Sequence, residues 1–162
     1  MTDKPTPEEI AFWQRRLASQ ANNRAWTLAE ATSRTKGEDE EMLQAAHAAM
    51  YFWNIVGNAS HRAHAAQLLA HVYALLKLGG PAAHYFAKSE PVFDSGSAEG
   101  SETAFAHAIA SNVAAANKDA AAHRLHYDKA FELAASLGAE DKKILEATLR
   151  ILPKPQDENS AA

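Results

Sequence analysis

The chain of 162 residues contains no cysteine, and it has no long uninterrupted apolar run. Without cysteine it can form neither a disulfide framework nor a thiolate site for a metal or a nucleophile. Its densest apolar patch, residues 50–53, is far shorter than the roughly 20 residues that a transmembrane helix needs. We therefore exclude a disulfide-stabilised scaffold and expect no membrane partner.

Basic residues are also scarce, since 16 Lys and Arg stand against 20 Asp and Glu, for a net charge of -4. They occur as isolated pairs, such as Arg15–Arg16 and Lys142–Lys143, and a phosphate backbone needs a basic stripe. We therefore expect no nucleic-acid partner. Residues 1–9 are polar and acidic, whereas a signal peptide has a basic start and an apolar stretch. These features predict a cytoplasmic protein.

Alanine dominates several stretches, such as residues 45–49 and 120–122. It has the highest intrinsic helix propensity and allows two helices to approach closely. No segment shows the two-residue alternation of β-branched residues that is typical of a strand. The composition therefore predicts an all-α fold, and the length predicts a single domain.

Capping signals divide the chain into helices. Thr6, Pro7 and Glu9 predict a helix start with a capping box, and glycines mark several helix ends. About seven helices are expected, at residues 6–35, 38–57, 60–78, 81–88, 102–116, 119–137 and 139–152, with Gly79–Gly80 ending the third and residues 90–101 forming a loop. We expect residues 1–5 to be disordered, residues 6–152 to form the domain, and residues 153–162 to form a disordered tail.

Small and large apolar residues recur at set intervals through residues 61–89. Leu69–Ala70 and Tyr73 match the first helix of a tetratricopeptide repeat (TPR), and Ala82 and Phe86 match its second helix. This segment resembles a TPR, whereas residues 102–137 fit less well and the first two helices only loosely. The resemblance implies antiparallel hairpins in a right-handed superhelical stack, closed by a C-terminal capping helix. It also implies a non-catalytic scaffold that binds a protein or peptide.

Polar residues occupy positions that line the concave groove in this family. Asparagine can both donate to and accept from the backbone of an extended peptide, and histidine would make such a groove sensitive to pH. The alternative is that these side chains merely face water. The groove implied by the resemblance comprises His64, Gln67, His71, Asn112, Trp26 and Glu30.

Histidine supports a second hypothesis, a metal-dependent helical-bundle enzyme. His61, His64 and His71 share one side of the third expected helix, and His123 and His126 lie three residues apart on the sixth. Facing helices can pool such side chains around a metal. However, no His-Glu-x-x-His or Glu-x-x-His motif accompanies them. The main prediction therefore includes no metal and no cofactor.

The aromatic segment Tyr51–Trp53 supports a third hypothesis, a structural homo-oligomer. Adjacent helical residues are separated by about 100°, so the three rings cannot all face one core. Core packing of this segment is the simpler interpretation. If one ring is exposed, the Trp53 region could instead form a homodimer interface.

Overall fold

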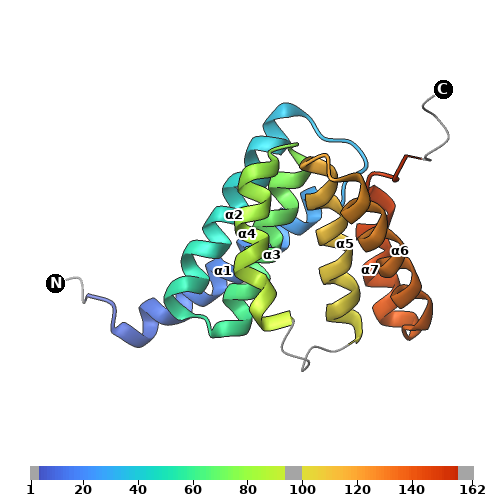
Figure 1. Ribbon diagram of the computed structural model, residues 1–162. Coiled ribbons are helices and arrows are strands. Elements are labelled where there is room, and N and C mark those ends of the chain that lie inside the picture. Colours follow the sequence, from blue (N-terminus) through green and yellow to red (C-terminus); the bar gives the residue numbers. More distant parts are fainter. Residues whose placement is uncertain (1–3, 94–99, 157–162) are drawn as a thin grey trace.

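The computed structural model describes residues 4–93 and 100–156, which form seven helices and no strand (Figure 1). The all-α prediction is therefore confirmed for these residues. None of the helices described is long and apolar enough to cross a membrane. In chain order the helices are α1 (Pro7–Ala29), α2 (Lys36–Val56), α3 (Ala59–Leu75), α4 (Gly79–Phe93), α5 (Gly100–Ala116), α6 (Ala120–Ser136) and α7 (Ala139–Ile151).

The start of α1 is the capping box that the sequence predicts. The backbone N–H of Glu9 donates to Thr6 Oγ1 at 3.2 Å, and the backbone N–H of Thr6 donates to the Glu9 carboxylate at 2.8 Å. Thr35 and Glu38 form a second box of the same kind, which begins α2 at Lys36. The helix expected over residues 6–35 is shorter than predicted, because α1 ends at Ala29 and the second box separates it from α2.

The end of α3 differs from its prediction. The helix ends at Leu75, and Gly79 and Gly80 are the first residues of α4 rather than a stop signal. Lys77 adopts the left-handed conformation, with φ 61°, that often follows a helix C-terminus. Gly79 is needed for another reason, since a Cβ there would lie 2.7 Å from the carbonyl oxygen of Ala116.

The region predicted as one long loop is largely helical at both of its ends. α4 continues to Phe93 instead of ending near residue 88, and α5 begins at Gly100. Residues 94–99 of the predicted loop lie outside the described residues. Pro91 lies in the last turn of α4 and has no backbone N–H, so it cannot donate the helical bond to the carbonyl oxygen of Ala87.

The helices form two layers along the chain (Figure 1). One layer holds the odd-numbered helices: α1 contacts α3, α3 contacts α5, and α5 contacts α7. In the other layer α2, α4 and α6 each contact the two odd-numbered helices that flank them in the sequence. α1 and α2 thus lie at one side of the molecule, and α6 and α7 lie at the other.

The core is divided into clusters that follow this series. Met42 and Leu68 are fully buried in a cluster shared by α1, α2 and α3. Ala70 and Ile109 belong to the next cluster, in which the small Ala70 is packed with large partly buried rings. Leu145 belongs to a third cluster, shared by α5, α6 and α7. Each helix therefore buries its apolar residues mainly against its neighbours in the series.

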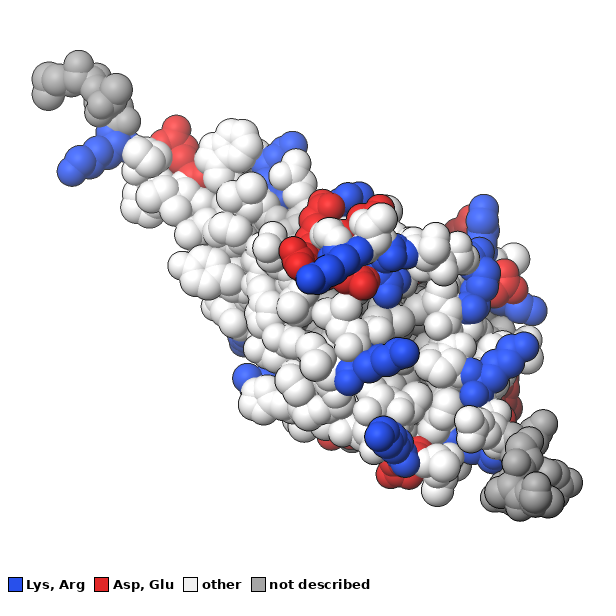
Figure 2. Space-filling model, turned by 90° about the horizontal axis from the view of Figure 1, so that it is seen from above, with Lys and Arg blue, Asp and Glu red and all other residues white. Residues whose placement is uncertain are grey.

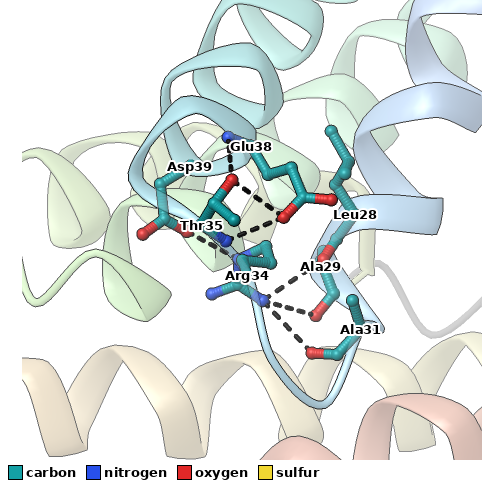
Figure 3. A network of polar contacts seen from close by, with 7 residues as sticks. All are labelled: Leu28, Ala29, Ala31, Arg34, Thr35, Glu38 and Asp39. Atoms are coloured by element: carbon teal, nitrogen blue, oxygen red, sulfur yellow. Dashed lines mark hydrogen bonds and ion pairs between the residues drawn. The ribbon is translucent and has the colours of Figure 1, made fainter.

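Arg34 closes the connection between α1 and α2 (Figure 3). Its Nη1 donates to the carbonyl oxygen of Leu28 at 3.2 Å and contacts those of Ala29 and Ala31 at 3.5 and 3.4 Å. Its Nε donates to Asp39 Oδ1 at 2.6 Å. The last carbonyls of a helix have no partner within that helix, so Arg34 satisfies groups that would otherwise need water. Only 14% of its side chain is exposed.

Candidate functional site

The residues predicted to line a groove converge on the layer of odd-numbered helices. Trp26 comes from α1, Gln67 and His71 come from successive turns of α3, and Asn112 comes from α5. We call these four residues the inner cluster. His71 and Asn112 lie 41 residues apart in the sequence, yet their side chains are in contact.

Most of the inner cluster is buried, so these residues do not line an open groove in the state that the structure describes. The exposed fraction is 4% for Gln67, 0% for His71 and 1% for Asn112. Trp26 stacks on the His71 ring with centroids 5.6 Å apart, and it meets Phe105 of α5 edge to face at 6.3 Å. These two rings occupy the space that a groove would need.

The hydrogen bond between Asn112 and His71 defines the state of the imidazole. Asn112 Nδ2 donates to His71 Nδ1 at 3.1 Å, so Nδ1 must be unprotonated. The neutral ring then carries its proton on Nε2. Burial lowers the pKa of His71 from 6.5 to about 3, and the positive charge of Arg34 acts in the same direction. The imidazole is therefore neutral at physiological pH and does not provide the pH sensitivity expected of a groove histidine.

Two hydrogen-bond donors of the inner cluster have no partner. Among the residues that the structure describes, neither Gln67 Nε2 nor His71 Nε2 meets an acceptor, although both atoms are buried. A buried donor left unpaired costs about 1–3 kcal/mol. Buried polar groups in native proteins are usually satisfied, so two unpaired donors one helical turn apart call for an explanation.

His64 and Glu30 lie at the edge of the inner cluster. His64 is about half exposed, with Nε2 3.3 Å from Glu102 Oε1 and Nδ1 2.9 Å from the carbonyl oxygen of Ser60. Glu30 follows α1 and is partly buried, and this burial raises its pKa. The hydroxyl of Thr148 and the charge of Arg150 act in the opposite direction, which places the end of α1 close to α7.

Sequence reasoning missed two residues near the cluster. Arg34 influences His71 electrostatically and closes α1, but no motif in the sequence identifies it. Thr148 is fully buried on α7. A signal for Thr148 was available, because it interrupts an apolar stripe that includes Leu145 and Leu149.

The histidines of the metal hypothesis have separate structural roles. His61 stacks on Trp53 with ring centroids 4.3 Å apart, His123 Nε2 contacts a backbone carbonyl beyond α7 at 2.9 Å, and His126 contacts His107 at 2.8 Å. Within residues 4–93 and 100–156, no group of three or more His, Asp or Glu side chains could hold a metal ion. The metal site proposed from the sequence is therefore not assembled in these residues.

In the Trp53 region the tryptophan is buried, whereas the neighbouring surface of α2 exposes Tyr51 and Ile55, the latter at 50%. Trp53 itself is only 8% exposed and belongs to a core cluster between α1, α2 and α3. Tyr51 is the exposed member of the aromatic segment, at 63%. An interface centred on Trp53 would require that ring to leave the core.

Residues 153–156, expected in a disordered tail, lie against α6. The carbonyl oxygen of Pro153 contacts His123, and the carbonyl oxygen of Gln156 accepts a hydrogen bond from Arg124. These contacts continue the chain along the outer side of the last helices. No family model, curated protein or solved structure matches the chain.

Proposed function

We propose that this protein is a non-catalytic, TPR-like module that binds a protein or peptide on its layer of odd-numbered helices. The proposed architecture pairs α1 with α2, α3 with α4 and α5 with α6 as antiparallel hairpins in a right-handed superhelix, with α7 as the cap. The helix contacts support this proposal, because each pair contacts mainly the pairs next to it in the sequence. The fully buried Ala70, packed among larger residues, is also consistent with hairpin stacking.

The observation that carries the binding proposal is the pair of unpaired donors at Gln67 Nε2 and His71 Nε2. Both lie on the inner cluster, at positions where a purely structural helix would carry leucine. The carbonyl oxygens of an extended peptide are acceptors that these donors lack. A bound peptide would therefore remove the free-energy cost of the two unpaired donors, which the free protein retains.

Binding at this place requires a rearrangement of the free protein. Trp26 stacks on His71 and is itself only partly buried, so its ring is the group that must move to admit a peptide. The observed state is then the closed one, and the apparent affinity is lowered by the small fraction of open molecules. His64 and Glu30 at the edge would contact charged groups of the partner.

The test uses peptides selected from a random display library against the full chain, with affinities measured by fluorescence polarisation. Gln67→Leu should weaken binding at least about tenfold, because it removes a donor whose bond forms only in the complex. Its unfolding midpoint should be unchanged or higher, since the unpaired group is also removed from the free protein. Tyr51→Ala, on the exposed side of α2, is the matched control and should bind normally.

Trp26→Ala provides a second test, in which the affinity for the peptide should increase rather than decrease. Removing the ring should tighten binding, because less of the binding energy is spent on opening the site. Failure to enrich any peptide would contradict the proposed function. Equal affinity of an enriched peptide for the wild type and for Gln67→Leu would contradict the proposed site.

A further inference from the structure

The first half of α1 extends beyond the helices that cover the rest of it (Figure 1). No residue of α1 before Ala18 is buried, whereas four residues from Ala18 onward are. Four large apolar side chains on this part are exposed: Ile10 at 43%, Phe12 at 54%, Trp13 at 59% and Leu17 at 43%. A contiguous apolar surface of this kind is uncommon on a monomer and typically marks an interaction site.

Ile10, Trp13 and Leu17 form a single stripe, which we call the α1 stripe, whereas Phe12 lies about 100° away from Trp13 around the helix. The spacings of three and four residues within the stripe place its members within about 60° of one another around the helix axis. The stripe lies beside the core-facing side of α1, which carries Ala18 and Ala25. It is the geometry that a helix uses to pack along a second helix.

The charges that flank the stripe indicate which second helix fits. Glu9 and Arg16 are seven residues apart, so they lie on the same flank of the helix. The Arg16 guanidinium lies 6.0 Å from the centroid of the Trp13 ring, at the edge of the stripe, and 5.5 Å from that of the Phe12 ring. Figure 2 shows that the protruding part of the molecule carries both acidic and basic side chains beside uncharged surface.

Two antiparallel copies of α1 would satisfy both the stripe and its charges. A twofold axis near Trp13 sets Glu9 of each copy against Arg16 of the other, because like flanks meet in an antiparallel pair. The same pairing brings Ile10 of each copy beside Leu17 of the other. In a parallel pair this flank would instead face the opposite flank of the other copy, so Glu9 and Arg16 would not meet. The charges of Glu9 and Arg16 are therefore complementary to those of a second copy that is related by a twofold axis.

We infer that the protein forms a homodimer through antiparallel packing of the α1 stripe, with two symmetric ion pairs between Glu9 and Arg16. The interface covers only the exposed turns of one helix from each copy. It therefore falls at the small end of specific interfaces, below about 1,200 Å² in total. A dimer of this size should dissociate in the micromolar range and exchange its subunits readily.

Sedimentation equilibrium of the full chain over a wide concentration range tests the dimer. The wild type should show a reversible monomer–dimer equilibrium. The double variant Trp13→Ala with Leu17→Ala should raise the dissociation constant at least about tenfold, because the apolar contact is removed. Circular dichroism checks that the helix content of the variant is unchanged.

Charge reversal tests the antiparallel pairing itself. Glu9→Arg alone and Arg16→Glu alone should each weaken self-association, since each places like charges together. An equimolar mixture of the two variants should restore the dimer, because every pair across the interface is then opposite in sign. Arg15→Glu, on the far side of the helix, should leave the dimer unchanged. Thr6→Ala, which removes the cap without changing a charge, should also do so.

Three outcomes would overturn the inference. The first is a wild type that remains monomeric at every concentration. The second is a dimer that the stripe variant does not weaken. The third is a mixture of the two charge variants that stays monomeric. A monomer whose stripe variants lose the binding of a different purified protein would assign the stripe to that protein instead of to a second copy.

Discussion

The buried imidazole of His71 should make the stability of this fold depend on pH. Its pKa is about 3 in the folded protein, against 6.5 for an ordinary histidine. Between these two values the unfolded chain binds a proton that the folded protein excludes. The free energy of unfolding must therefore fall as the pH decreases from about 6.5 toward 3, and this loss is absent above the unfolded value.

The size of the effect follows from the difference between the two pKa values. Each pH unit within this window costs about 1.4 kcal/mol of unfolding free energy. Between pH 7 and pH 5 the contribution of His71 is about 2 kcal/mol, since only about 1.5 units of that interval lie within the window. This is a large share of the roughly 5–15 kcal/mol by which a native domain is stable.

Urea unfolding followed by circular dichroism, at pH 7, 6 and 5, measures this contribution. The comparison is between the wild type and His71→Gln, which keeps an oxygen that can accept from Asn112 but cannot be protonated. The wild type should lose about 2 kcal/mol more than the variant between pH 7 and pH 5. His84→Gln, at an exposed position, should follow the wild type.

Taking the difference between the two proteins removes the contribution of the other histidines, provided that they titrate alike in both. An equal loss of stability in the wild type and in His71→Gln would refute the reasoning. It would mean that the His71 imidazole can take up a proton while the protein remains folded.

Two further predictions concern stability, and both are measured by urea unfolding. Arg34→Ala should cost about 2–3 kcal/mol, because it removes the ion pair with Asp39 and the hydrogen bonds to the carbonyl oxygens of Ala29 and Ala31. Arg24→Ala, in an exposed ion pair, should have little effect, and similar losses in the two variants would contradict the role of Arg34. Gly79→Ala should cost about 1–3 kcal/mol because the added Cβ would lie 2.7 Å from the carbonyl oxygen of Ala116. Gly80→Ala meets no atom within 4 Å and should be neutral or slightly stabilising, so a larger loss at Gly80 would contradict this account.

The helical class and several helix boundaries could be predicted from the sequence, because they depend on local interactions. A capping box needs only residues three positions apart, so Thr6 and Glu9 predict the start of α1 correctly. The turn before α6 and its cap at Asp119 are local in the same way. The sequence could not show why residue 79 must be glycine, because the atom that leaves no room for a Cβ there is the carbonyl oxygen of Ala116, 37 residues away.

Whether the inner polar residues face water or the interior depends on how the helices pack together. The spacing of His64, Gln67 and His71 places them on one side of a helix. The same spacing is compatible with a side that lines a groove and with a side that other helices cover. The stacking of Trp26 on His71 and its contact with Phe105 settled the matter, and these rings come from helices far apart in the sequence. Burial depends on how helices pack, and no local pattern in the chain encodes it.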